Sequence, residues 1–177
     1  MSGWSQDRYN AALRFAAEVH QGQTVPGTEL PYLMHLTSVA METIAACAAE
    51  PALDADLAVT CALLHDSIED AGVEQAEIAN RFGAAVAAGV AALSKRPDLP
   101  KPDAMRDSLA RIRQQPHGVW AVKLADRITN LQPPPGHWTA PKIATYREEA
   151  RLIHAELGAA SPFLATRLAA KIERYGA

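Results

Sequence analysis

The sequence predicts an all-α protein, and three observations support this prediction. Alanine is abundant and aromatic residues make up only 6% of the chain, a balance that favours helices over strands. Apolar residues recur at the three- and four-residue spacing of amphipathic helices. No β-hairpin signal interrupts that pattern. The length of 177 residues is that of one ordinary domain, so we expect residues 1–177 to form a single helical bundle.

The N-terminal part of the chain contains two predicted helices separated by a loop. The first helix covers residues 5–20 and starts at Ser5, whose hydroxyl is a favourable N-cap. The stretch QGQTVPGTELPY (residues 21–32) predicts a loop, because glycine and proline punctuate it. A second helix follows at about 33–48, and Pro51 prevents it from continuing.

The third helix is predicted to begin at a cap formed by Asp54 or Asp56, to run to about Asp70 and to stop before Gly72. Beyond it, the pattern is interrupted at the charged, proline-rich stretch SKRPDLPKPD and again at QPPPG. The helices expected around these interruptions cover about residues 74–81, 84–94, 103–115, 118–131, 138–157 and 161–174.

Charge and composition exclude several classes of function. The net charge of −3 and the pI near 6.1 lack the basic footprint of a nucleic-acid-binding protein. Cys47 and Cys61 lie in apolar helical patterns without a CxxC partner, which predicts reduced core residues in a cytoplasmic protein. Asp7 and Arg8 interrupt the segment where a signal peptide would be apolar, and no segment reaches the roughly 18 apolar residues of a membrane span. We therefore expect a soluble protein that binds neither nucleic acid nor membrane.

The stretch CALLHDSIEDAGV (residues 61–73) places His65 and three carboxylates at the end of an otherwise apolar helix. In a continuous helix, Asp66 lies one turn from both Glu69 and Asp70, and like charges at that spacing cost about 0.2–0.5 kcal/mol per pair. Acidic groups in the last turns also oppose the helix dipole by roughly 0.3–1 kcal/mol each. A divalent cation would offset these costs, and a solvated acidic helix end is the alternative.

Two further helices each supply one candidate metal ligand. His35 begins the apolar helix after the loop, where it is either a ligand or a hydrogen-bonded core histidine. Asp126 lies in the apolar run WAVKLADRITNL, where its partner is either a metal or a neighbouring Lys123 or Arg127. Together with His65 and Asp66 these residues form a set of two imidazoles and two carboxylates without thiolates. Such a set suits Mn²⁺ or Fe²⁺, with Zn²⁺ or Mg²⁺ as alternatives.

Four blocks of sequence, in order, resemble a known family: HQGQTVPGTELPYLMH, ALLHDSIED, RFGAAVAAGVAALSK and VKLADRITNL. They resemble the HD superfamily of metal-dependent phosphohydrolases. More narrowly, they resemble the hydrolase domain of the bifunctional alarmone enzymes and their small stand-alone relatives, which remove the 3′-pyrophosphate of guanosine tetra- and pentaphosphate. The resemblance covers roughly residues 8–150.

The resemblance implies that Mn²⁺ is bound by His35, His65, Asp66 and Asp126. It also implies that Glu69 and Asp70 serve the attacking water and that Asn130 lines the substrate pocket. Helical spacing agrees, because Glu69 follows His65 by four residues and Asp70 follows Asp66 by four. Either acid would then deprotonate the water. Asn130 follows Asp126 by one turn, and the alternative is an exposed residue at a helix end.

A polyanionic substrate also requires cations. Lys95 is one candidate contact, and Lys142 with Tyr146 matches positions where the stand-alone alarmone hydrolases carry a basic residue and a tyrosine. The loop departs from the family pattern, because Thr24 and Val25 stand where a basic residue normally packs against guanine. The loss of such a stacking cation costs on the order of 0.5–2 kcal/mol, which affects recognition of the base more than the chemistry.

Three functions follow from these patterns. The first is hydrolysis of the 3′-pyrophosphate of a guanosine alarmone. The second is the same metal chemistry on another phosphorylated nucleotide, such as the 2′-phosphate of NADPH. The third is a non-catalytic metal-binding helical module, which the complete set of ligands and acids disfavours. The pattern indicates a small phosphorylated nucleotide as partner and specifies no oligomeric state.

Overall fold

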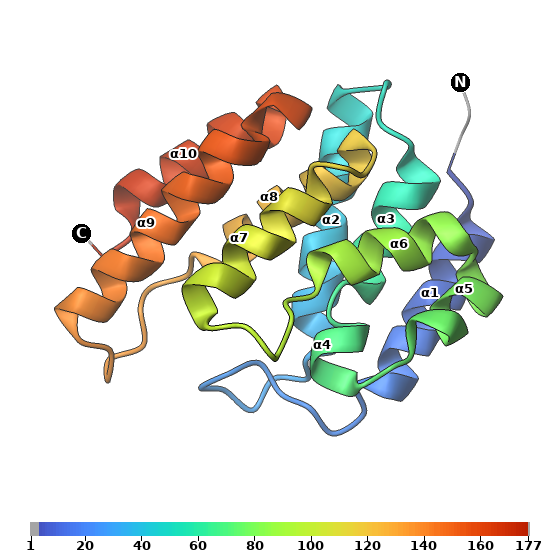
Figure 1. Ribbon diagram of the computed structural model, residues 1–177, viewed down its shortest axis with the longest axis horizontal. Helices are drawn as coiled ribbons and strands as arrows, with labels where there is room; N and C mark the ends of the chain where they lie inside the picture. Colours follow the sequence, from blue (N-terminus) through green and yellow to red (C-terminus); the bar gives the residue numbers. More distant parts are fainter. Residues whose placement is uncertain (1–3, 177) are drawn as a thin grey trace.

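The computed structural model describes residues 4–176, and within this range the chain is helical, as predicted (Figure 1). Its helices are α1 (Gln6–Val19), α2 (Leu33–Ala49), α3 (Ala55–Leu64), α4 (Ser67–Ala71), α5 (Gln75–Phe82), α6 (Ala84–Leu93), α7 (Lys101–Ile112), α8 (His117–Asn130), α9 (Ala140–Leu157), a 3₁₀ turn (Gly158–Ala160) and α10 (Pro162–Arg174). Apart from one isolated bridge, Thr24 to Pro31, the described residues form no β-structure. The fold is a single all-α domain. The predicted extent of 1–177 includes residues 1–3 and 177, which lie outside the described range.

Helices α2, α3 and α8 form the centre of the domain. Each of the three packs against the other two, and α3 is buried from Leu57 through Leu64. Helices α1, α5 and α6 lie on one side of this centre, and α9 and α10 lie side by side on the other (Figure 1). A helix that is apolar on every face is stable only when neighbours surround it, which is the position that α3 occupies. Functional groups at the ends of α2, α3 and α8 are therefore held by the core.

The predicted caps explain where two of these helices begin. The Ser5 side chain accepts a hydrogen bond from the backbone N of Arg8, and that of Asp54 accepts one from Leu57. Asp56, the other candidate cap, instead accepts a 2.7 Å hydrogen bond from the backbone N of Ser5. The two aspartates therefore differ in role: Asp54 caps α3, whereas Asp56 ties the start of α1 to it.

The prediction of one helix from Asp54 to Asp70 is wrong. Helix α3 ends at Leu64, Asp66 has a φ of −100° and a ψ of 1°, and the separate helix α4 begins at Ser67. The His65 ring provides a physical reason, since its Nδ1 lies 2.8 Å from the carbonyl oxygen of Ala62. In a continuous helix the N–H of Asp66 would donate to that carbonyl. Competition from the ring favours a turn at this point.

This break changes the electrostatics of the acidic residues. Glu69 and Asp70 lie in the first turn of α4, not in the last turn of a long helix. The dipole penalty expected from the sequence therefore does not apply to them, because the N-terminus of a helix attracts negative charge. Helix α4 ends at Gly72, which adopts the left-handed conformation with a φ of 67°, a position that favours glycine.

The two cysteines are free. Cys61 is fully buried, and a side-chain carbon at Gly89 would lie only 2.8 Å from its Sγ, so the thiol fills the space that this glycine leaves. Burial is the main cause that raises the pKa of Cys61 to about 12 and that of the half-buried Cys47 to about 11. Within residues 4–176 no helix has the length and hydropathy needed to cross a membrane.

Candidate metal centre and substrate pocket

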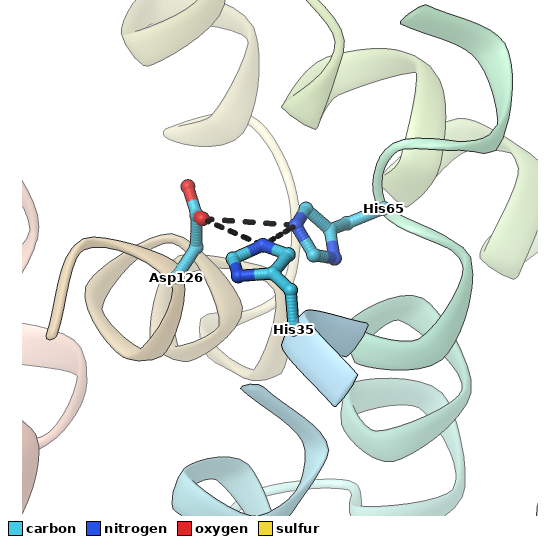
Figure 2. A group of neighbouring side chains, drawn as sticks. All are labelled: His35, His65 and Asp126. Carbon is cyan, nitrogen blue, oxygen red and sulfur yellow. Dashed lines mark hydrogen bonds and ion pairs between the residues drawn. The ribbon is translucent and has the colours of Figure 1, made fainter. Parts of the chain in front are cut away.

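Three helices bring His35, His65 and Asp126 together in the interior (Figure 2). His35 lies in the first turn of α2, His65 follows the last residue of α3, and Asp126 belongs to the last third of α8. The Nε2 atoms of the two histidines are 3.3 Å apart, and the Oδ1 of Asp126 lies 3.5 Å from one and 3.7 Å from the other. All three residues are buried, so their donor atoms meet in a site largely shielded from water.

Asp66, the fourth predicted ligand, joins this group from the turn between α3 and α4. Its Oδ2 lies 2.9 Å from Nε2 of His65 and 3.6 Å from Nε2 of His35. The four predicted ligands therefore converge, although they come from three separate parts of the sequence. The break at Asp66 lets consecutive residues, His65 and Asp66, point to the same place.

The chemistry of these donors fits a divalent cation. The carbonyl of Ala62 can only accept, so Nδ1 of His65 carries the proton that it donates. Its Nε2, which faces the other donors, is then the atom that can exchange its proton for a cation, the arrangement found in histidines that bind metals. Two imidazoles and two carboxylates, without a thiolate, form a set suited to six-coordinate transition metals.

The charges of the site are strongly coupled. Burial alone would lower the pKa of His65, but the charges and hydrogen bonds of Asp66 and Asp126 outweigh burial and raise it. Burial alone would raise the pKa of Asp126, but the Lys123 charge and the hydrogen bonds of His35 and His65 hold it well below its usual value. Burial would also raise the pKa of Asp66, but the charge and hydrogen bond of His65 lower it to about 2. Both carboxylates are therefore ionised at neutral pH.

Asp126 is fixed by two neighbours on its own helix. Nζ of Lys123 lies 3.0 Å from Oδ2, and Nδ2 of Asn130 donates a 2.6 Å hydrogen bond to Oδ1. The sequence left Lys123 and Arg127 as alternative partners for Asp126, and the structure selects Lys123. Arg127 instead lies 3.4 Å from Glu149 and stacks over the ring of Tyr146. Because Lys123 holds one carboxylate oxygen, the other faces the histidines.

Tyr32 is a site residue that the sequence analysis missed. Its hydroxyl donates a 2.6 Å hydrogen bond to Oδ2 of Asp66 and lies 3.4 Å from Oδ2 of Asp70. Burial, followed by the charge of Asp66, raises the pKa of Tyr32, so the hydroxyl remains a donor. A tyrosine beside an apolar run looks like a core residue. The available signal was its position three residues before His35, within one helical turn.

The HQGQ stretch supports the same region from the loop. Nδ1 of His20 lies 2.7 Å from Oε1 of Gln23, and Nε2 of Gln23 donates a 3.0 Å hydrogen bond to the backbone oxygen of Asp70. The His20 ring also packs 5.3 Å, centroid to centroid, from the ring of Tyr32. Residues from the first loop therefore position α4 and Tyr32 without belonging to the group of four donors.

The two predicted acids have different surroundings. The Glu69 carboxylate accepts hydrogen bonds from the backbone N of Lys95 at 2.8 Å and from its Nζ at 3.1 Å. Asp70 has no such cation within hydrogen-bond distance among residues 4–176. Burial, then the charges of Asp66 and Glu69, raises the pKa of Asp70. A carboxylate with a raised pKa accepts a proton more readily than an ordinary aspartate, so Asp70 is the candidate base.

A pocket of about 880 Å³ opens beside the centre. His35 and Asn130 connect the pocket to the group of four donors. The first loop and the aromatic residues Trp138 and Tyr146 contribute further parts of its lining. Val25 lines the pocket, so an apolar side chain forms its wall near the position where the family carries a basic residue.

The predicted substrate contacts divide into two groups. Asn130 and Tyr146 line the pocket, whereas Lys95 and Lys142 are not among its lining residues. Lys95 is paired with Glu69 on the α4 side, and Lys142 lies 4.1 Å over the ring of Trp138. Lys142 therefore contacts Trp138, which lines the pocket, but does not line it itself. Lys95 instead contacts the carboxylate of Glu69.

Comparisons with known proteins agree with this geometry. A family profile described as “HD domain” matches residues 12–162. The chain belongs to the HD-domain family. The match spans the helices that carry all four donors of the site.

This HD-domain protein is similar to curated relatives along most of its length. It is 32% identical over 141 residues to the guanosine-3′,5′-bis(diphosphate) 3′-pyrophosphohydrolase MESH1 of Danio rerio, covering 77% of this chain and 76% of that one. It is 31% identical over 145 residues to the human protein of the same name, covering 77% of each. A solved structure of a metazoan orthologue of SpoT, which hydrolyses ppGpp, matches with a TM-score of 0.81 over 99% of both chains, at 22% identity. At that identity the structural match shows a shared HD-domain fold.

Proposed function

We propose that this HD-domain protein is a divalent-cation-dependent hydrolase that removes the 3′-pyrophosphate of guanosine 3′,5′-bis(diphosphate)-type alarmones. The observation that carries the proposal is the group of His35, His65, Asp66 and Asp126 opening onto a pocket large enough for a nucleotide. The activity named for the MESH1 relatives supports the choice of substrate.

The proposed cofactor is Mn²⁺, with Fe²⁺, Zn²⁺ and Mg²⁺ as alternatives, and the proposed ligands are His35, His65, Asp66 and Asp126. A cation bound there supplies Lewis-acid chemistry to the attacking water and to a phosphoryl oxygen. The protein contributes the orientation of the ligands: Lys123 and Asn130 hold Asp126, and Tyr32 holds Asp66. Such neighbours fix the direction of ligand atoms and so determine affinity for the cation.

In the proposed reaction, water bonds to the phosphorus attached to the 3′ oxygen, the bond between that phosphorus and the 3′ oxygen breaks, and pyrophosphate leaves. The water gives up a proton, and the 3′ oxygen gains one. Asp70 accepts the proton, since its pKa is raised and its carboxylate shares the Tyr32 hydroxyl with Asp66. Glu69, held by Lys95, orients the water. Its negative charge helps to raise the pKa of Asp70.

The nucleoside occupies the pocket between the first loop and the aromatic wall. Tyr146 offers a stacking surface for the base, with the Arg127 guanidinium over its ring at 4.2 Å. Asn130 reaches the pocket beside the centre, where its amide can contact a ribose or phosphate oxygen. Lys142 lies over the ring of Trp138 and so holds this part of the pocket wall in position.

A second candidate function is hydrolysis of another phosphorylated nucleotide, such as the 2′-phosphate of NADPH. The apolar Val25 favours this alternative, because the loop offers no cation at that position to stack on guanine. A non-catalytic metal-binding module is the third candidate. A cytoplasmic location and the absence of nucleic-acid and membrane partners remain predictions.

A substrate panel tests these candidates. Purified protein with Mn²⁺ is incubated with guanosine and adenosine 3′,5′-polyphosphates, mononucleotides and NADPH, and released phosphate and pyrophosphate are measured separately. The proposal predicts pyrophosphate, released only from nucleotides with a 3′-diphosphate. Orthophosphate from monoesters would select the second function. Binding of metal without turnover of any substrate would select the third.

A further inference from the structure

The pocket is lined on one side by α10, a helix that carries none of the site residues predicted from the sequence. Arg167 and Lys171 of α10 line it, together with Tyr175, the residue directly after the helix. The four-residue spacing places Arg167 and Lys171 on one face of α10. Helix α10 also packs on α8 and α2, which carry Asp126 and His35. The α10 face is therefore a wall of the same pocket that reaches the proposed metal centre.

The two ends of this face are fixed by contacts with other helices. Nε and Nη2 of Arg167 each donate a 2.5 Å hydrogen bond to the buried Glu42 of α2. At the other end, the ring of Tyr175 packs 5.7 Å, centroid to centroid, from that of Tyr146. Lys171 lies between them in the sequence, four residues from each. It therefore faces the space between the Arg167–Glu42 ion pair and the proposed stacking surface.

Lys171 differs from Arg167 in having no acidic partner among the described residues. Among the described residues that line the pocket, these two are the only lysine or arginine side chains. Glu42 neutralises Arg167, whereas no acidic side chain within residues 4–176 forms an ion pair with Lys171. Glu42, the only acid among the described lining residues, is already paired with Arg167. The α10 wall therefore presents one net positive charge to the pocket.

A nucleotide with phosphate groups at two positions needs a cation for each. The proposed metal centre serves the group that is hydrolysed, and Lys95 and Lys142 do not line the pocket. We propose that Lys171 binds the anionic group that is not hydrolysed, the 5′-diphosphate of a bis-phosphorylated nucleotide. This inference rests on the proposed function and deepens it, because it makes the α10 wall select doubly phosphorylated substrates over 3′-phosphorylated ones with a free 5′-hydroxyl.

The kinetic test compares two substrates, guanosine 3′,5′-bis(diphosphate) and guanosine 3′-diphosphate with a free 5′-hydroxyl. With Lys171→Gln, we expect KM for the first substrate to rise about ten- to hundredfold, which is the loss of a charge-assisted contact, with kcat nearly unchanged. KM for the second substrate stays the same. An equal effect on both substrates, or no effect on either, overturns the proposal.

Arg174→Gln is the matched control. Arg174 lies on the same helix, three residues after Lys171; it lines a neighbouring surface hollow, to which Arg167 and Lys171 also contribute, but it does not line the pocket. If attraction by the general charge of α10 were responsible, Arg174→Gln would raise KM as much as Lys171→Gln. The proposal predicts that Arg174→Gln leaves KM within about twofold of wild type, because an exposed charge outside the pocket is screened by salt.

A binding measurement separates this inference from the proposed function. Guanosine 5′-diphosphate, the nucleotide product, and guanosine are each titrated calorimetrically into wild type and Lys171→Gln. Wild type should bind the diphosphate at least tenfold more tightly than guanosine, and Lys171→Gln should lose that preference. If wild type hydrolyses no alarmone, the proposed function fails, and this titration still decides the role of Lys171. Equal affinity of wild type for guanosine 5′-diphosphate and guanosine overturns the proposed role of Lys171.

Discussion

On the α2, α3 and α8 side of the pocket, each histidine Nε2 lies 2.9–3.7 Å from an oxygen of Asp66 and of Asp126. On the α10 side, Lys171 has no ionic partner among the described residues. The first region is crowded with groups that compensate one another, and the second presents a single charge to an open space. The difference indicates two kinds of site in one pocket: a preorganised group of ligand atoms, which we propose for chemistry, and a simpler wall, which we propose for recognition.

The difference predicts how mutations divide. Changes on the α2–α3–α8 side should affect metal content and kcat, because those side chains hold the reacting groups. Changes on the aromatic and α10 side should affect KM, because those side chains contact parts of the substrate that do not react. The following predictions test that division, beginning with the largest expected effect.

Asp126→Ala should abolish metal binding and reduce kcat/KM by at least about 1,000-fold. Lewis-acid stabilisation is worth several kcal/mol, and each 1.36 kcal/mol corresponds to tenfold in rate. The measurements are elemental analysis and pyrophosphate release, with a thermal melt to show that the variant is folded. Asp103→Asn, an exposed carboxylate of α7, is the control and should match wild type. Full activity of Asp126→Ala would contradict the proposal that Asp126 binds a metal needed for the reaction.

Asp70→Asn should keep the metal and lower kcat by about 100- to 10,000-fold, the usual contribution of a positioned base. Asparagine preserves the shape of the side chain and still accepts from Tyr32. Glu69→Gln should also keep the metal but lose less turnover, about ten- to hundredfold, because it removes charge-assisted hydrogen bonds to Lys95 and not the base itself. Single-turnover kinetics on both variants measure the rate at which bound substrate is hydrolysed. A larger loss for Glu69→Gln would reverse the assignment of the two acids.

Tyr32→Phe should weaken metal affinity or activity by about 10- to 100-fold, as expected for a residue that positions a ligand. The hydroxyl lies 2.6 Å from Oδ2 of Asp66, and its removal leaves that oxygen with one hydrogen bond fewer. Competition with a chelator gives the affinity. Tyr9→Phe is the control, since Tyr9 packs against Trp4 and is not among the residues of the site. Unchanged affinity would mean that Asp66 needs no help from Tyr32.

Tyr146→Ala should raise KM for the alarmone about tenfold and leave metal content unchanged. Stacking of a base on an aromatic side chain is worth about 1–3 kcal/mol. Tyr146→Phe keeps the ring and should behave like wild type, although its edge no longer carries the hydroxyl. Steady-state kinetics on the two variants check this. A loss of metal in Tyr146→Ala would show that the aromatic side of the pocket also supports the metal centre, contrary to the proposed division.

Much of the fold and of the metal centre could be predicted from the sequence. The caps at Ser5 and Asp54 could be identified because capping is local, a matter of one side chain and the next turn. The four donors could be identified because ionisable groups in apolar helices need a partner. That requirement predicts from the sequence alone that the four side chains converge.

The remaining features depend on contacts between distant segments. The helix break at Asp66 involves a competition between the His65 ring and the backbone for one carbonyl, which periodicity does not reveal. Tyr32 looks like a core residue until α4 is placed beside it. Lys171 looks like a solvated helix residue until α10 packs on α8 and α2. In each case tertiary packing determines the role, and no local pattern encodes it.

The most direct test of the central claim is an anomalous difference map from crystals of the protein loaded with Mn²⁺. We expect one strong peak between Nε2 of His35, Nε2 of His65 and the carboxylates of Asp66 and Asp126. A peak elsewhere in the molecule, or none in crystals that contain manganese, would contradict it.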